Sequence, residues 1–380
     1  MKFLVKESAQ SRKTLTLLSI LIATMSSLAM ISGGMSANAA TSLKKVNVLT
    51  TPSYIPAPPT NGSDEYRCFV LDPKITKSSF LQSVLITPNN PSVSHHGILY
   101  RLAATNTAAA KTLDAQTTEP GWSCFGDTGI PGAEAFGAAP SSSWISFWAP
   151  GGNFKQFPAG TGMSMSLGDK FILQVHYHVM PGMKASSASM SVTLKYATAP
   201  VKQLKTFLLA APIELACLDS ESGPLCNRDA AIADLAKRTS DKSLFTGAGL
   251  TLSCGGDISN PVASPISTCT QRLRSPVTIY GSTGHMHQLG RSISITLEDG
   301  VSGNITTLTS QSQWNFDNQK TDWVAKPLVA KAGDKLKVSC TYDLKLRSLL
   351  PEFKNQPPRY VVWGEGSTDE MCLAIVNYAD

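Results

Sequence analysis

The feature of this sequence that most restricts its fold is a series of short segments in which apolar and polar residues alternate. Alternation with a period of two places successive side chains on opposite faces of a β-strand, whereas a helix needs a period near 3.6. Clusters of Gly, Pro, Asn and Ser separate the segments, as turns between strands require. The chain is therefore predicted to be all-β, with two tandem β-sandwich or jelly-roll domains. The clearest segments are 171–178, 191–196, 277–280, 292–297 and 335–340.

A targeting segment precedes these strands. Four basic residues lie before an apolar run, Leu15–Ile31, and Ala37-Asn38-Ala39 has the pattern of a signal-peptidase site. Residues 1–39 are therefore predicted to be a signal peptide, with an uncleaved membrane anchor as the alternative. Removing its four basic residues and one acidic residue lowers the formal charge from +6 to +3. That charge gives no electrostatic reason to expect nucleic acid as a partner, and no later run is long enough to span a membrane.

The remaining chain divides into two halves of similar style. Residues 40–65 contain a Pro- and Thr-rich stretch and are expected to form an extended lead-in. We expect an N-terminal domain over 66–199 and a C-terminal domain over 200–380. A Cys-rich insertion at about 215–270 fits the strand pattern least well. It contains the one convincing helix of the sequence, Arg228–Arg238.

All eight cysteines follow the predicted signal peptide, and none forms a C-x-x-C pair. An even number behind a signal peptide indicates disulfides and a secreted or periplasmic protein. The spacing argues against a zinc ribbon or a thioredoxin-type site. Because short loops close at low entropic cost, we expect Cys217–Cys226 and Cys254–Cys269 to be local pairs.

The six histidines fall into three pairs, which carry the functional signal. His176 and His178 are two residues apart, so in a strand their side chains share one face, and the same holds for His285 and His287. Each pair can therefore bind one metal ion. His95 and His96 are adjacent and face opposite ways in a regular strand. They can share an ion only at a strand end or a bulge, or through different ring nitrogens.

The residues around the histidines favour copper. Neutral imidazole suits zinc, copper, iron and nickel, and no acidic residue lies within the three motifs, which weakens iron and zinc sites that need a carboxylate. A thioether favours Cu(I). Met371 lies in a polar loop before the last strand, beside Cys372, and is the candidate sulfur ligand.

These motifs resemble those of the copper type II, ascorbate-dependent monooxygenases, the family of dopamine β-monooxygenase and peptidylglycine α-hydroxylating monooxygenase. They occur in the family's order over roughly 66–378, and two of them look closer to the dopamine β-monooxygenase branch. The five matching features are His95-His96-Gly97, Trp148-Ala149-Pro150-Gly151, Leu173-Gln174-Val175-His176-Tyr177-His178, His285-Met286-His287-x-Leu289-Gly290 and Asp369-Glu370-Met371-Cys372.

The resemblance implies one copper site in each domain, facing each other across a solvent-filled cleft. It implies an electron-transfer copper on His95, His96 and His176, with His178 as a neighbour. A second copper, which binds dioxygen and substrate, would lie on His285, His287 and Met371. The resemblance also implies ascorbate or a similar reductant, and two further disulfides: Cys68–Cys124 and Cys340–Cys372.

The sequence thus predicts a monooxygenase that hydroxylates a C–H bond of a small molecule. Gln174 shares a strand face with His176, so its amide can orient substrate or solvent. The alternatives are a non-catalytic extracellular protein that binds or delivers copper, and a β-sandwich adhesion module. Where the peptide-hydroxylating branch has an Arg, an Asn and a Tyr for the substrate carboxylate, this chain has Thr283, Leu373 and Ile375. A desolvated carboxylate would lack a partner there, which argues against peptides ending in glycine.

Overall fold

The strand Lys170–His178 (β9) lies at the centre of the N-terminal half. Its sequence, KFILQVHYH, is rich in the β-branched and aromatic residues that favour strands. In the computed structural model it is hydrogen-bonded to Asp64–Leu71 (β2) on one side and Ser94–Leu102 (β4) on the other, both antiparallel. Every residue from Phe171 to Tyr177 is buried. The two polar side chains of this segment, Gln174 and His176, are therefore inside the protein.

The structure describes residues 46–58, 63–125, 128–131, 143–152, 155–180, 182–354 and 356–380. These residues all fall within one compact unit. The remaining strands of the first half are β1 (Val46–Thr50), β3 (Ser79–Pro88), β5 (Trp122–Ser123), β6 (Trp144–Trp148), β7 (Lys155–Gln156), β8 (Thr161–Met165) and β10 (Met190–Tyr196). Those of the second half are β11 (Lys202–Ala210), β12 (Glu214–Leu215), β13 (Ile266–Arg272), β14 (Val277–His285), β15 (Gly290–Glu298), β16 (Ile305–Gln311), β17 (Asp322–Ala330), β18 (Lys335–Tyr342), β19 (Val361–Val362) and β20 (Leu373–Ala379).

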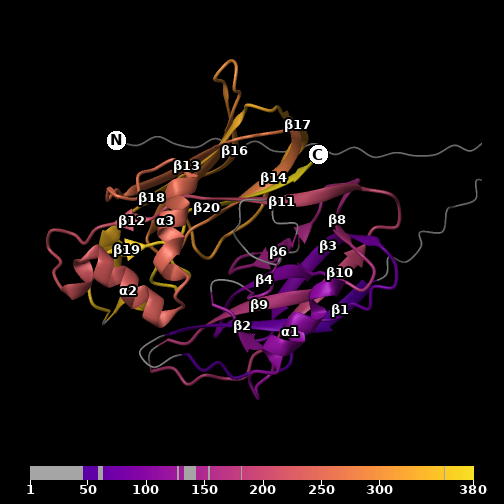
Figure 1. The fold of residues 1–380 in the computed structure, drawn as a ribbon, viewed down its shortest axis with the longest axis horizontal. Helices are drawn as coiled ribbons and strands as arrows, with labels where there is room; N and C mark the ends of the chain where they lie inside the picture. Colours follow the sequence, from indigo (N-terminus) through magenta and orange to yellow (C-terminus); the bar gives the residue numbers. More distant parts are fainter. Residues whose placement is uncertain are drawn as a thin grey trace, which may run out of the picture. The chain divides into compact units, whose positions relative to one another are not determined.

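Four sheets are formed by the described strands (Figure 1). The first half contributes the sheet β5-β2-β9-β4-β6, and the second half contributes β13-β18-β15-β16 and the short pair β12-β19. The largest sheet has the order β1-β10-β3-β8-β11-β20-β14-β17, with β7 beside β3. Within it, β11 pairs in parallel with β8 and antiparallel with β20. This sheet therefore runs without interruption from one half of the chain into the other.

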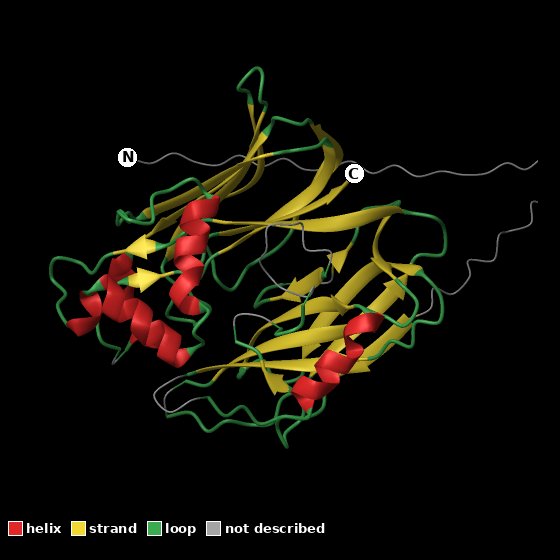
Figure 2. Ribbon diagram, in the orientation of Figure 1, coloured by secondary structure: helices red, strands yellow, loops and turns green. Residues whose placement is uncertain are grey.

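The described residues form few helices, and two of these belong to the Cys-rich insertion (Figure 2). Arg228–Arg238 (α2) has the bounds predicted from sequence, and the Asn227 side chain caps it by accepting the N–H of Ala230. Ser243–Ser253 (α3) packs against α2, whereas Thr107–Asp114 (α1) belongs to the first half. The sequence did not indicate α1 or α3. None of the described helices is long and apolar enough to cross a membrane.

The buried apolar side chains form two large clusters. One is drawn mostly from the first half, including Leu81 and Phe171, and also contains Leu204, Tyr280 and Ala379 of the second half. The other draws on both halves and joins residues such as Trp144 to the strand β20. The second cluster places apolar side chains from both halves around the sites described below.

The mostly β fold with antiparallel sheets confirms the fold class predicted from the sequence. All five alternating segments lie within strands. The expected lead-in is partly a strand, since Val46–Thr50 pairs with β10. The predicted signal peptide lies outside the described residues. Four disulfides are present, with the pairings that we expected: Cys68–Cys124, Cys217–Cys226, Cys254–Cys269 and Cys340–Cys372.

Candidate metal centres

Three histidines from two paired strands converge on one point. His95 and His96 come from β4 and His176 comes from β9, and one ring nitrogen of each lies within 4.8 Å of the others. The Nδ1 atom of His176 is 3.0 Å from Nδ1 of His95 and 3.2 Å from Nδ1 of His96. The β4–β9 register shifts between Ser94 and His96. This irregularity allows adjacent histidines to reach the same point, as the sequence required.

Burial keeps these imidazoles neutral. It lowers the pKa values of His95 and His96 well below the usual range for histidine, and it also lowers the pKa of His176, against the opposing effect of Asp64. The Tyr66 ring stacks on the His176 ring with their centroids 4.1 Å apart. Neutral imidazole is the form that binds a metal ion. The three facing nitrogens therefore have the chemistry of a metal site.

His178 takes a different position from His176, although both belong to β9. Its Nδ1 atom lies 2.9 Å from Asp64 Oδ1 and 3.1 Å from Ser367 Oγ, and its Nε2 atom lies 3.2 Å from Met180 Sδ. It does not belong to the three-histidine cluster. Strand alternation alone made His176 and His178 equal candidates for metal binding. In the structure the His176 ring faces the other two histidines of the cluster, whereas the His178 ring faces Asp64 and Ser367.

The second pair of histidines also presents proton-free nitrogens. The Nδ1 atom of His285 lies 2.6 Å from Gln319 Oε1, and that of His287 lies 3.0 Å from the carbonyl oxygen of Asp369. Because both oxygens can only accept, each Nδ1 carries the proton and each Nε2 keeps its lone pair. The Nε2 atom of His287 is buried and has no hydrogen-bond partner among the described residues. An orphaned acceptor of this kind fits a metal ligand.

Burial also sets the protonation of this pair. It lowers the pKa of His285 to about 4 and that of His287 to about 3, so both rings are neutral at pH 7. Their ring centroids are 5.2 Å apart. We expected both on one strand, but β14 ends at His285 and His287 lies in the turn beyond it. The turn, rather than strand alternation, brings the two rings together.

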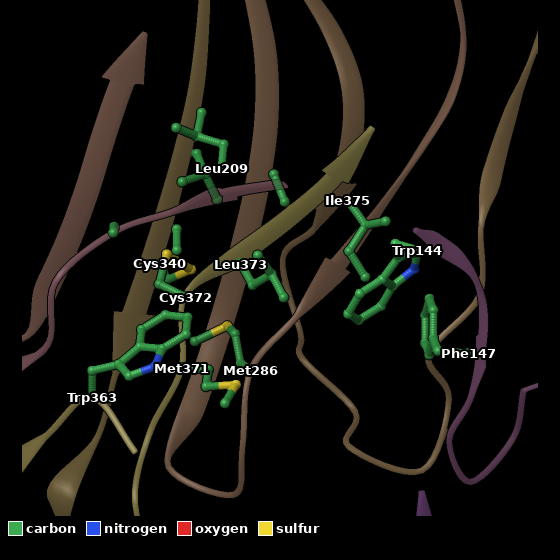
Figure 3. Packing of buried hydrophobic residues seen from close by; sticks show 14 of the residues in the cluster. Trp144, Phe147, Leu209, Met286, Cys340, Trp363, Met371, Cys372, Leu373 and Ile375 are labelled. Atoms are coloured by element: carbon green, nitrogen blue, oxygen red, sulfur yellow. A yellow bond between two sulfur atoms is a disulfide. The ribbon is translucent and has the colours of Figure 1, made fainter. Parts of the chain in front are cut away.

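Met371 is held firmly in the loop before β20. Its carbonyl oxygen accepts the Tyr342 hydroxyl at 2.8 Å, and its neighbour Cys372 is disulfide-bonded to Cys340. Figure 3 shows Met371 beside this disulfide and Met286. The buried Glu370 carboxylate accepts the backbone N–H of His287 at 3.0 Å. The loop that carries the thioether is therefore bonded to the turn that carries His287.

A largely apolar pocket connects the two histidine sets. Gln174 is on its wall, and its side-chain amide donates to the carbonyl of Cys124 at 2.9 Å. Among the described lining residues none is a lysine or an arginine. They are Tyr66, His96, Ile98, Tyr100, Trp144, Phe147, Ala149, Gln174, His285, Glu365, Met371, Leu373 and Ile375.

The separation of the two sets differs from the solvent-filled cleft that the resemblance implies. The ring centroids of His96 and His285 are 6.4 Å apart. Phe316, from the second half, stacks on the His95 ring at 5.0 Å, and the Tyr66 hydroxyl donates to the carbonyl of Glu365 at 2.6 Å. These contacts across the halves bring the two sets together.

Several residues that shape the sites carried no signal in the sequence. Asp64, Phe316 and Gln319 contact the histidines from segments far away in the chain. None of them belongs to a histidine motif, and a single sequence does not reveal which loop folds over which strand. Glu370 was part of a recognised motif, but its bonds to the backbone were not foreseeable.

Residues 262–380 match the family described as "Copper type II ascorbate-dependent monooxygenase, C-terminal domain". This part of the chain is therefore similar to the C-terminal domain of that family. The matched residues include His285, His287 and Met371, and the three-histidine cluster precedes them. The match does not resolve a branch of the family.

Likenesses to solved structures are weak. A subviral particle of infectious bursal disease virus VP2 is 7% identical over 88% of this chain and 72% of that one, with a TM-score of 0.18. Vicilin from Solanum lycopersicum (tomato) is 8% identical over 84% and 75%, with a TM-score of 0.16. A CBM22 tandem domain from Paenibacillus barcinonensis Xyn10C is 9% identical over 87% and 83%, also at 0.16. Likenesses at these scores carry no argument about fold or function.

Proposed function

We propose that this chain is a copper-dependent monooxygenase that hydroxylates a C–H bond of a small, partly apolar molecule. The observation that carries the proposal is the presence of two sets of neutral imidazoles that border one pocket. The match of residues 262–380 to the C-terminal domain of the copper monooxygenase family supports the same reaction. Dioxygen and a one-electron reductant such as ascorbate are the co-substrates.

The donor sets suit two copper ions. His95, His96 and His176 would hold one ion through Nδ1, and His285, His287 and Met371 would hold the other through two Nε2 atoms and a thioether. Bound copper would supply one-electron transfer and the activation of dioxygen. The chain's own residues fix the imidazole tautomers, exclude water and shape the pocket. Gln174 is proposed to orient substrate or solvent there.

The pocket favours an uncharged or partly apolar substrate. Leu373 and Ile375 lie on its wall, and the Thr283 hydroxyl is bonded to Thr321 at 2.8 Å. A carboxylate entering here would find no described lysine or arginine in the lining. We therefore propose that peptides ending in glycine are not substrates. Aryl-alkyl compounds, with or without an amine, are the first candidates.

We assign residues 66–199 to the domain of the three-histidine site and 200–380 to the domain of the Met371 site. The four disulfides fit an oxidising compartment. We propose that the protein is secreted or periplasmic, with residues 1–39 as a cleaved signal peptide. Mass spectrometry of the exported protein would give the mature N-terminus, and we expect it near Ala40.

The deciding experiment loads the mature protein with copper and adds ascorbate. Metal analysis should give about two coppers per chain, since two donor sets are present. Dioxygen consumption coupled to ascorbate oxidation should follow, with hydroxylated product detected by mass spectrometry among phenethyl compounds, small amines and peptidylglycines. If the protein binds copper stoichiometrically but consumes no oxygen with ascorbate, it is instead a copper-binding or copper-delivery protein. If it does not bind copper stoichiometrically, it is an adhesion module.

Two methionine variants test the second site. Met371→Leu keeps the side-chain volume but removes the proposed thioether, so we expect oxygen-coupled turnover to fall at least 10-fold while the first copper stays bound. Met286→Leu makes the same change at a buried neighbour and should keep turnover. Full turnover in Met371→Leu would rule out Met371 as a ligand.

A further inference from the structure

One carboxylate oxygen lies where three elements meet. Asp64, the first residue of β2, presents its Oδ1 atom to His176 Nε2 at 2.7 Å, His178 Nδ1 at 2.9 Å and Ser367 Oγ at 2.8 Å. The two histidines belong to β9, and Ser367 belongs to the loop before β20 in the other half of the chain. The side chain of Asp64 is 12% exposed. Water therefore has little access to this junction.

The junction fixes which nitrogen of His176 is available to a metal ion. A carboxylate oxygen can only accept, so the Nε2 atom that faces Asp64 carries the proton. The Nδ1 atom on the opposite side of the ring is left with its lone pair. That atom is the one that faces Nδ1 of His95 and Nδ1 of His96. Asp64 thus aims the ligand atom of His176 without touching the proposed metal position.

The same oxygen also restrains the loop that carries Met371. Ser367 precedes Met371 by four residues. The Asp369 carboxylate closes the loop by accepting the backbone N–H of Gly366 at 3.1 Å. Because the loop is closed in this way, holding Ser367 holds the whole segment 364–371. The bond from Ser367 to Asp64 therefore joins the thioether loop to the three-histidine cluster.

We propose that Asp64 is a positioning residue shared by both sets of metal ligands. It selects the ligand nitrogen of His176 and, through Ser367, keeps the Met371 loop against the first half of the chain. His178 holds the Asp64 carboxylate in place through its Nδ1 atom and is not a metal ligand. The inference rests on the proposed function only in taking His95, His96 and His176 as a metal site.

The first test is on the histidine tautomer. In the metal-free protein labelled with ¹⁵N-histidine, NMR should show a protonated Nε2 and an unprotonated Nδ1 for His176, assigned with a His176→Gln variant. Asp64→Asn removes the charge and turns one oxygen into a donor. We expect it to mix the tautomers and to weaken copper binding at the three-histidine site 10- to 100-fold, the usual loss when the carboxylate behind a ligand histidine is removed.

Asp72→Asn is the matched control, because it changes the charge equally at a carboxylate whose ion-pair partners among the described residues are Lys74 and Lys170. It should leave copper affinity within twofold. The inference is overturned if Asp64→Asn binds copper as tightly as Asp72→Asn does, or if His176 in the wild-type protein is protonated at Nδ1. The wild-type measurement decides the tautomer even if Asp64→Asn fails to fold.

The second test is on the loop. Ser367→Ala should speed backbone hydrogen exchange across 364–372 at least 10-fold in the metal-free protein, and Asp64→Asn should do the same from the other side of the bond. The double variant should exchange no faster than either single one, because both remove the same link. Ser292→Ala, which loses a hydroxyl bonded to Thr341, should not affect this loop.

Additive effects, or normal loop exchange in both single variants, would overturn the link between the two sites. Neither test depends on turnover. A wild-type protein that binds copper through these residues but hydroxylates nothing would refute the proposed function and leave the positioning role intact. The two ideas can therefore fail separately.

Discussion

Gly151 is the point where the first half of the chain touches the loop beside both histidine sets. It has φ of +71°, and a Cβ atom there would lie 1.9 Å from the carbonyl oxygen of Asp317. Real Cβ contacts are essentially never shorter than 3.0 Å, so the two backbones would have to separate by about 1 Å. The loop that would move carries Phe316, which stacks on His95, and Gln319, which bonds His285.

We predict that Gly151→Ala destabilises the protein and loosens both sites. The left-handed conformation costs an alanine about 1–2 kcal/mol. The forced shift adds about 1–3 kcal/mol, as overpacking does elsewhere. Gly160→Ala isolates the second contribution, because Gly160 has a similar φ of +74° and, apart from its chain neighbours, no described residue has an atom within 4 Å of the place its Cβ would take. The two alanine variants share the backbone penalty and differ in the contact.

The assay is urea denaturation of the metal-free variants, followed by copper titration. We expect Gly151→Ala to lose about 1–3 kcal/mol more unfolding free energy than Gly160→Ala. We also expect it to bind copper more weakly, whereas Gly160→Ala binds as the wild type does. Equal losses in the two variants, with equal copper affinity, would refute the close approach of the two backbones.

Three further predictions concern the framework of the second site. If loop entropy dominates, removing the Cys340–Cys372 disulfide, which spans 32 residues, should lower the free energy of unfolding by about 3.7 kcal/mol. Removing Cys217–Cys226, which spans 9 residues, should lower it by about 2.6 kcal/mol. Glu370→Ala should cost about 2–6 kcal/mol, because it leaves the N–H groups of His287 and Leu289 buried without an acceptor. Arg238→Met should cost about 1.5–3 kcal/mol and loosen the Met371 loop, because it removes the charged donor 3.1 Å from the buried Asp369.

Controls for these predictions come from the surface of the same half. Glu298→Ala breaks a partly exposed pair with Lys335 and should cost less than 1 kcal/mol. Arg291→Met breaks a 4.0 Å pair with Asp343, and Arg291 is 58% exposed, so we expect no measurable change. Unfolding by urea, and hydrogen exchange over 364–372 for Arg238→Met, provide the measurements. Losses no larger than those of the controls would contradict the assignments.

Local patterns allowed much of this structure to be predicted. The alternation of apolar and polar residues located the strands, because one face of each strand is buried. His95 and His96 are adjacent and can reach one ion only where a strand is irregular, and β4 contains such an irregularity. The helix α3 was missed because its sequence, SLFTGAGLTLS, contains two glycines that each weaken a helix by about 1 kcal/mol. Its apolar residues also follow no clear helical face.

Long-range pairing accounts for most of what the sequence did not reveal. The parallel contact of β8 with β11 depends on two segments about 40 residues apart, and no local pattern encodes it. His176 and His178 both contact Asp64, which is more than 100 residues away in the chain. A carboxylate so distant becomes a neighbour only once β2 has paired with β9.

The uninterrupted sheet through β11 has a consequence for taking the molecule apart. A cut near residue 200 would leave β8 in one fragment and β11 in the other with a bare hydrogen-bonding edge, which is a ready template for another chain. Separate expression of either fragment should therefore yield precipitate or misassembled dimers. Mixing the two fragments during refolding should rescue both, because each supplies the missing neighbour of the other.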